Sequence, residues 1–175
     1  YLEIQKDENG DLVNGTSYNG GMDIKYGIND AFTLDMTLIP DFGQVQSDAQ
    51  ILNLSPFEVR FGENRQFFTE GTELFRKGGL FYSRRIGGSP LNDYLVDDAL
   101  DNDSNLVVDN RPPDVQLMNA TKISGRNKHG LGIGFFNAIT KPTKATLKGV
   151  DPDSGEEYVK EIETSPLTNY NIIVL

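Results

Sequence analysis

The chain has 175 residues, and its 26 acidic and 16 basic residues give a formal net charge of −10 and a pI near 4.5. This length matches about one domain, and the acidic balance argues against nucleic-acid binding, which needs a basic surface. The absence of cysteine and the single histidine exclude disulfides, thiolate sites and multi-histidine metal centres. No apolar run is long enough for a transmembrane helix, and the first ten residues do not have the pattern of a signal peptide.

The first predicted element is a β-hairpin. In Phe32–Leu38 the even positions are apolar and the odd positions are polar, and the stretch 22–28 alternates in the same way. Side chains of a strand point alternately to opposite faces, so this period of two predicts two amphipathic strands. The intervening Asn29-Asp30 is a two-residue hairpin signal.

A second hairpin and a last strand follow later in the chain. Leu117–Arg126 and Leu131–Thr140 alternate, and the polar residues 127–130 predict a short turn between them. A final amphipathic stretch starts at Thr168 and continues to the last residue. We therefore expect residues 1–175 to be a single partial domain, a fragment of a longer protein.

Two long excursions separate these elements. In 40–116, capping-box patterns predict short helical turns near 48–54 and 56–60, whereas the aromatic-rich segments 66–69 and 80–85 predict short strands. Residues 92–114 are acidic and are expected to be a loop. Residues 141–167 predict a protruding hairpin that turns at 151–155.

Amphipathic strands joined by alternating short turns and long loops are typical of an outer-membrane β-barrel, of which this chain would form part. The apolar face would contact membrane lipid, and the other face would line the lumen. A soluble, half-buried antiparallel sheet alternates in the same way, so that interpretation stays open. The expected lumen-facing charged residues are Asp23, Lys25, Asp35, Lys122 and Arg126.

Several motifs resemble a known family when taken in order. They are Gly20–Gly27, Ile39–Val45, Asn53–Glu58, Glu63–Gly71 and Leu80–Gly87. In this order they resemble a Bacteroidota cell-surface family, the domain of unknown function 5916. The resemblance is dense over 20–88 and looser over 115–140, and the segments 92–114 and 145–163 look specific to this chain.

The resemblance implies an architecture and a location. Members of the family look like a β-sandwich similar to carbohydrate-binding module 9, followed by an outer-membrane β-barrel, and this chain matches part of the barrel region. The family pattern has a proline where Gln66 stands here. The sandwich lies outside the matching region, so the resemblance transfers no catalytic residue.

The strongest candidate for a binding site is a cluster of charges among the phenylalanines of the long excursion. It binds a polar ligand inside the barrel, or it is a salt-bridge network that anchors the excursion to the lumen wall; Arg suits bidentate contacts in both cases. A glycosidase with paired carboxylates at positions 63 and 70 is a third, distant alternative. The cluster consists of Glu63, Arg65, Glu70, Arg84 and Arg85.

A weak calcium pattern lies in the acidic segment. The alternating oxygen ligands resemble the start of a calcium-binding loop, but the glycine and the closing glutamate of such a loop are absent. No other cofactor is expected. The candidate ligands are Asp101, Asp103, Asn105 and Asp109.

The favoured hypothesis is therefore a fragment of an outer-membrane barrel at the bacterial cell surface. It would bind or pass a polar molecule, with a saccharide as the candidate ligand and membrane lipid as the partner. A soluble β-rich periplasmic or surface binding module is the alternative. Enzyme activity is left open, with a non-enzymatic role favoured.

Overall fold

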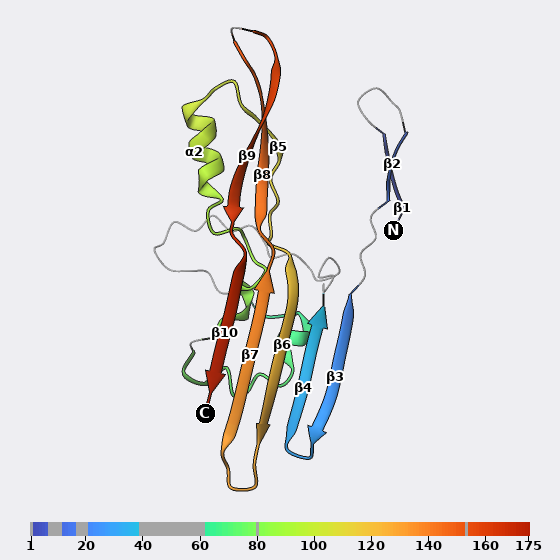
Figure 1. The fold of residues 1–175 in the computed structure, drawn as a ribbon, viewed down its shortest axis with the longest axis vertical. Coiled ribbons are helices and arrows are strands. Elements are labelled where there is room, and N and C mark those ends of the chain that lie inside the picture. The colour runs from blue at the N-terminus through green and yellow to red at the C-terminus, as the bar shows by residue number, and fades with distance from the viewer. Residues whose placement is uncertain (1, 7–11, 17–20, 39–61, 80, 153) are drawn as a thin grey trace.

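The computed structural model describes residues 2–6, 12–16, 21–38, 62–79, 81–152 and 154–175. Within these residues the fold is mainly antiparallel β with a few short helices (Figure 1). The predicted helical turns near 48–54 and 56–60 lie outside the described residues. None of the described helices has the length and apolarity needed to span a membrane.

The described strands form three antiparallel sheets. A short hairpin pairs β1 (Leu2–Lys6) with β2 (Leu12–Thr16). The largest sheet, called sheet B, has the order β10-β7-β6-β4-β3, and sheet C has the order β5-β8-β9. The strands of sheet B are β3 (Met22–Asn29), β4 (Phe32–Leu38), β6 (Leu117–Arg126), β7 (Gly132–Thr140) and β10 (Thr168–Val174). Those of sheet C are β5 (Val107–Asn110), β8 (Thr143–Val150) and β9 (Glu157–Ser165).

Both predicted hairpins of sheet B are confirmed, and an asparagine side chain shapes each turn. The Asn29 amide oxygen accepts hydrogen bonds from the backbone N–H groups of Ala31 and Phe32. The Asn127 amide oxygen accepts two in the same way, from His129 and Leu131. Such side-chain bonds satisfy backbone donors that a tight turn would otherwise leave unpaired. The last predicted strand is also confirmed as β10.

Sheets B and C share one long ribbon. Strand β7 leads into β8, and β9 leads into β10. The stretch that contains β7 and β8 therefore pairs with the stretch that contains β9 and β10 along almost its whole length (Figure 1). The breaks fall at Pro142 and Pro166, because proline cannot donate a hydrogen bond to the ladder. The predicted hairpin thus forms the upper part of this ribbon.

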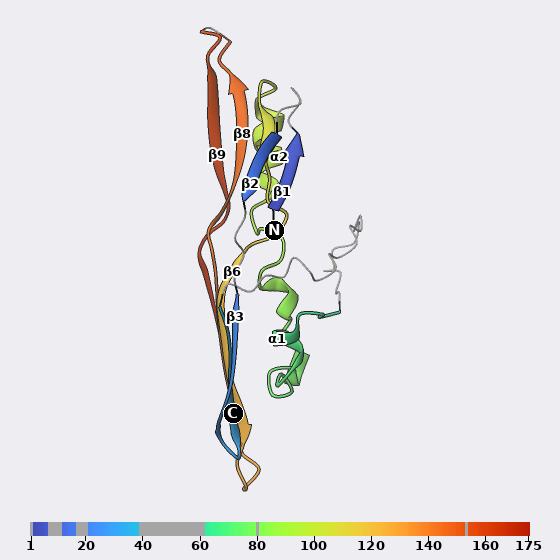
Figure 2. The same ribbon diagram turned by 90° about the vertical axis from the view of Figure 1, so that its right-hand side faces the viewer.

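One face of sheet B is covered by the described part of the long excursion, residues 62–90 without residue 80, which we call the insert (Figure 2). The insert contains α1 (Gln66–Thr69) and the short 3-10 turns η1 (Lys77–Gly79) and η2 (Ser83–Arg85). Its phenylalanines pack on the strands around Phe136, with ring centroids 5.1–6.4 Å away. The buried core between them contains Phe68, Phe75, Ile86, Leu117, Ala120, Phe136 and Ala138.

Three local predictions in the excursion are wrong. Residues 66–69 form a helical turn, and 83–85 form a 3-10 turn, where strands were expected. The aromatic side chains of these segments pack against a sheet and do not extend a ladder, so tertiary contacts override their β-propensity. The acidic segment 92–114 was expected to be a loop, but it contains α2 (Tyr94–Asn102) and β5.

Helix α2 packs on sheet C and forms a second small core. Val96 and Leu106 are buried against Ala145 and Leu147 of β8. Arg111 holds the start of the helix through paired hydrogen bonds to the carboxylates of Asp93 and Asp97, at 2.7–3.3 Å. These few contacts order a segment whose composition alone predicts a solvated loop.

Candidate functional site

The two faces of sheet B differ in polarity. In the ladder, Leu34 of β4 lies beside Ile123, Phe135 and Ile173 of the next three strands, so their side chains share one face. We call this the outer face. No described element covers it, and Tyr26 and Ile173 are 61% and 72% exposed. Its other exposed apolar side chains include Met22, Ile24, Ile28, Ile133 and Phe135.

The opposite, inner face is the one under the insert, and it contains the charged residues. Asp35 and Lys122 are cross-strand neighbours on it, and both are buried. In a soluble half-buried sheet the apolar face is covered and the polar face is wet. Sheet B instead buries a mixed face, in which Lys122 and Asp35 lie beside Phe136 and Ala138, and no described element covers its largely apolar outer face.

Lys122 is the centre of the contact between the sheet and the insert. This residue is 1% exposed, and its ammonium group donates hydrogen bonds to the carbonyl oxygens of Phe67 and Glu70. It also lies 3.7 Å from the Asp35 carboxylate and 4.4 Å from the centre of the Phe67 ring. The last carbonyls of a helix lack partners within the helix and carry negative partial charge, so the cation binds where α1 ends.

Gly71 lets the chain turn directly above this amine. Its φ of +59° lies in the left-handed region, which glycine adopts without strain. The Ser124 hydroxyl then donates to the Gly71 carbonyl, at 3.3 Å. Beside it, the amine of Lys25 on β3 forms an ion pair with Glu70, at 2.9 Å. The inner face therefore binds the insert through several strands.

A second polar network lies within the insert. The Arg65 guanidinium donates to both oxygens of Glu63, at 2.9 and 2.8 Å, and to the carbonyls of Ser83 and Ile86. The Ser83 hydroxyl donates to Glu63, at 2.6 Å. The two charged side chains are 4% and 7% exposed. This network joins the two ends of the insert and stacks on the Phe68 ring.

Electrostatics follows this geometry. Burial acts most strongly on Glu63 and raises its pKa, but the hydrogen bonds from Arg65 and Ser83 together outweigh it, so the pKa lies below the usual carboxyl value. Hydrogen bonds from Gln66 and Lys25 lower the pKa of Glu70. The general acid of a glycosidase needs a raised pKa, so neither carboxylate has the property that the glycosidase hypothesis requires.

The predicted charge cluster divides into two groups. Glu63 and Arg65 form the internal network, whereas Glu70 joins the contact with the sheet. Arg84 and Arg85 lie in η2, where the Arg85 guanidinium is 5.8 Å from the centre of the Tyr82 ring. Sequence reasoning missed Ser83 and the backbone carbonyls, because only the folded insert brings them to Arg65 and Lys122.

The expected lumen-facing residues all lie on the inner face or at its edge. Asp35, Lys122 and Lys25 contact the insert or one another, as described above. Asp23 pairs across the ladder with Thr37 and shares that face, and Arg126 is exposed at the end of β6. Whether this face lines a lumen stays a prediction.

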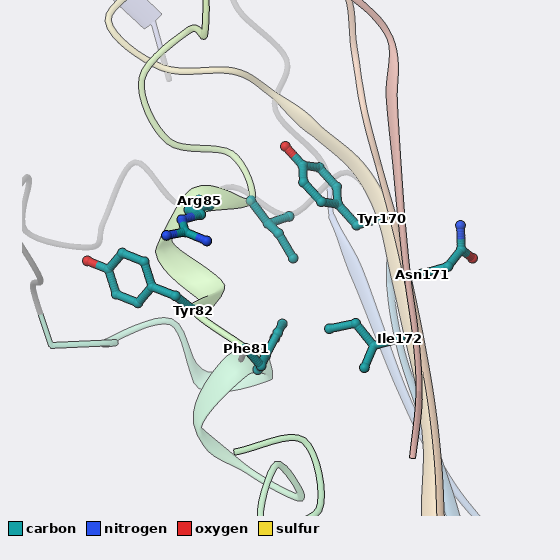
Figure 3. Close-up of a pocket in the computed structure, with 7 residues that line it drawn as sticks. Phe81, Tyr82, Arg85, Tyr170, Asn171 and Ile172 are labelled. Carbon is teal, nitrogen blue, oxygen red and sulfur yellow. The ribbon is translucent and has the colours of Figure 1, made fainter. Parts of the chain in front are cut away.

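A pocket of about 200 Å³ lies between the insert and β10 (Figure 3). Tyr170 and Ile172 point from the strand toward the insert, whereas Asn171 points away. Phe81, Tyr82, Arg85 and Ile86 line the other side. Sequence reasoning missed the pocket, because only the folded insert brings Phe81 and Ile86 beside Tyr170. The lining of the pocket thus includes aromatic residues and one arginine.

The calcium prediction gains no support from the acidic segment. The Asp103 carboxylate accepts hydrogen bonds from the Tyr158 hydroxyl and the Asn105 backbone, and Asp109 forms an ion pair with Lys148 at 2.6 Å. Across the described part of the chain, no three acidic or histidine side chains gather as metal ligands. Calcium binding through Asp101, Asp103, Asn105 and Asp109 stays a prediction.

Comparison with known proteins gives the family. The whole chain, residues 1–175, matches the family described as Domain of unknown function (DUF5916), and the chain therefore belongs to it. No curated protein and no solved structure matches the chain significantly.

The Lys122→Met variant tests the contact between sheet and insert. Removing the amine leaves Asp35 and two carbonyls buried without their cation, so we expect the full-length protein to lose about 3 kcal/mol of stability. Lys25→Met is the matched control, because this lysine is 64% exposed and should matter little. Thermal unfolding measures both variants. Equal small effects would contradict the anchoring role of Lys122.

Acid should weaken the insert through Glu63. Its pKa is lower in the folded protein than in the unfolded chain, so its stabilisation is complete above the usual carboxyl pKa and disappears as the pH falls through the lowered value. We expect Glu63→Gln to flatten the pH dependence of thermal unfolding from about pH 6 to about pH 3. The control is Glu73→Gln, at an exposed position of the insert. The account fails if both variants keep the wild-type slope.

Proposed function

We propose that this chain forms part of the wall of an outer-membrane-type β-barrel, with the insert as a plug on its inner side. The observation that carries the proposal is the exposed apolar face of sheet B. No described element covers the outer face, whereas the inner face, where Lys122 and Asp35 lie beside the phenylalanine core, is buried under the insert.

Water is a poor solvent for this arrangement. Contiguous exposed apolar patches of more than a few hundred Å² are rare on soluble proteins, and here such side chains cover five neighbouring strands. In a membrane, exposure of the apolar side chains is no longer unfavourable, because lipid tails solvate the outer face. The insert meanwhile satisfies the polar groups of the inner face. The strands have 7–10 residues, close to the ~9–11 of a tilted membrane-spanning strand.

Closure of the barrel requires more strands than sheet B contains. In the described residues the sheet is open, with β3 and β10 at its edges. The unpaired backbone groups of an edge cannot be left in hydrocarbon, so further strands must pair there. We therefore place the chain in the outer membrane as one segment of a larger barrel wall.

The proposed activity is the binding or passage of a polar molecule at the cell surface, with a saccharide as the candidate. The pocket beside β10 supports this part of the proposal. Its lining includes Tyr82, Tyr170 and Arg85, and pockets with apolar walls and a few polar groups are typical ligand sites. The pocket opens on the inner side of the sheet, where a passing solute would meet it.

Two arginine substitutions test the membrane part. Leu34→Arg places a charge on the outer face near the middle of the strand, which costs about 2–4 kcal/mol in a bilayer, so we expect loss of membrane-inserted full-length protein. Thr33→Arg, one residue away on the inner face, is the control. If the chain is a soluble binding module, Leu34→Arg will instead fold normally and stay in the soluble fraction.

Tyrosine substitutions test the ligand part. We expect Tyr170→Ala or Tyr82→Ala to lower the affinity of the full-length protein for those members of a panel of neutral and uronic-acid oligosaccharides that it binds. Tyr94→Ala on α2, far from the pocket, should leave affinity unchanged. Calorimetric titration measures the affinities. Unchanged affinity in both pocket variants would place the ligand elsewhere.

A further inference from the structure

The outer face of sheet B changes from apolar to polar along its strands. Asn137 of β7 donates hydrogen bonds to the side chains of Asn169 and Asn171 of β10, at 2.6 and 2.9 Å. Thr121 and Asn119 of β6 lie on the same face, in the same part of the sheet. We call Asn137, Asn169 and Asn171 the amide patch.

The amide patch needs polar surroundings. Among the described residues, the amide oxygen of Asn137 and the amide nitrogen of Asn169 have no protein partner. Leaving such groups in hydrocarbon costs about 2–7 kcal/mol each. The patch is therefore expected to contact water or polar headgroups, although Phe135 and Ile173 lie one row away on the same face.

The two turns of sheet B show how the strands would be inclined in a membrane. In the ladder Phe32 pairs with Gly125, and the Arg126 backbone N–H donates to the Ala31 carbonyl. The first turn therefore lies level with this part of β6, while β6 continues to its own turn at 127–130 (Figure 1). The second turn lies about 8 Å further along the strand direction than the first turn. Across the sheet, the two turns are separated by about 10 Å.

These offsets give a tilt. A plane through both turns makes an angle of about 40° with the rows of hydrogen-bonded residues that cross the sheet. Because the strands run at right angles to these rows, they are tilted by the same angle from the normal of that plane. This matches the ~35–45° tilt of strands in transmembrane barrels. From His129 in the second turn to Asn137, the strand advances about 26 Å along its own axis, and about 20 Å along the normal of that plane. The outer apolar band of such barrels is about 25 Å tall, so the amide patch lies near its upper limit.

The chain beyond the patch is charged and exposed. On the continuation of the same ribbon, Lys144 forms an ion pair with Glu161 and Lys148 forms one with Asp109, both at 2.6 Å and all at least one third exposed. Such strands do not lie in hydrocarbon. The patch thus separates an apolar part of the ribbon from a charged part.

We infer that the amide patch is a contact site for the polar headgroup layer of the membrane and marks where the barrel wall leaves the hydrocarbon. The inference rests on the proposed membrane function and adds the depth at which the chain lies. Sheet C and α2 then project into water beyond the headgroups, and the turns at Asn29 and Asn127 lie near the opposite surface.

Nitroxide labels on the full-length protein in phospholipid vesicles test this depth. Single cysteines replace Asn171, Ile173 or Ile172, one at a time, in a background without other cysteines. Accessibility to oxygen, which concentrates in hydrocarbon, is compared with accessibility to a water-soluble nickel chelate. We expect the label at 173 to favour oxygen, the label at 171 to favour nickel, and the control at 172, which lines the pocket on the inner face, not to favour oxygen.

The possible results separate the inference from the proposed function. Oxygen-rich labels at both 173 and 171 would place the patch inside the hydrocarbon and overturn the inference alone. Poor access of both reagents at 171, with oxygen at 173, would mean that another protein covers the patch, which also overturns it. A nickel-accessible label at 173 would contradict the membrane proposal itself.

Discussion

A buried ammonium group determines which side of sheet B is the inside. The amine of Lys122 is removed from water, and such a charge is tolerated only with close partners. Those partners are the end of α1, the ring of Phe67 and the carboxylate of Asp35. Because they come mainly from the insert, the insert must cover the face that carries Lys122. The phenylalanine core forms around this contact, and none of the described elements covers the opposite, largely apolar face.

This constraint links the local sequence to the proposed function. Period-two strands give two different faces, and the structure buries the one that combines Asp35 and Lys122 with the phenylalanine core. Gly71 and the short helices bring backbone carbonyls over the sheet, and the Glu63–Arg65 network keeps the insert folded. The outer apolar surface and the covered inner face are the two features on which the proposal of a plugged barrel wall rests. The pocket beside β10 and the amide patch then fall on opposite faces of the same sheet, one suited to a solute and the other to headgroups.

The parts of this structure that depend on neighbouring residues could be predicted from the sequence. The alternation of apolar and polar residues located β3, β4, β6, β7 and β10. The same alternation placed Asp35 and Lys122 among the residues expected on the polar face. The insert could not be predicted in this way, because Phe67 and Phe68 suit a strand as well as a helix and their packing on Phe136 joins residues far apart in the chain. Helix α2 depends on Arg111, which reaches back to Asp93 and Asp97. The anchoring carbonyls leave no signature in the side-chain sequence.

The most direct test of the central claim is the structure of the full-length protein in a lipid nanodisc, determined by electron cryo-microscopy. The account predicts that β3 and β10 continue into a closed barrel, that residues 62–90 lie inside it, and that the lipid density surrounds Ile24, Leu34 and Phe135. A second layer of protein packed over those three side chains, with no lipid against them, would contradict it.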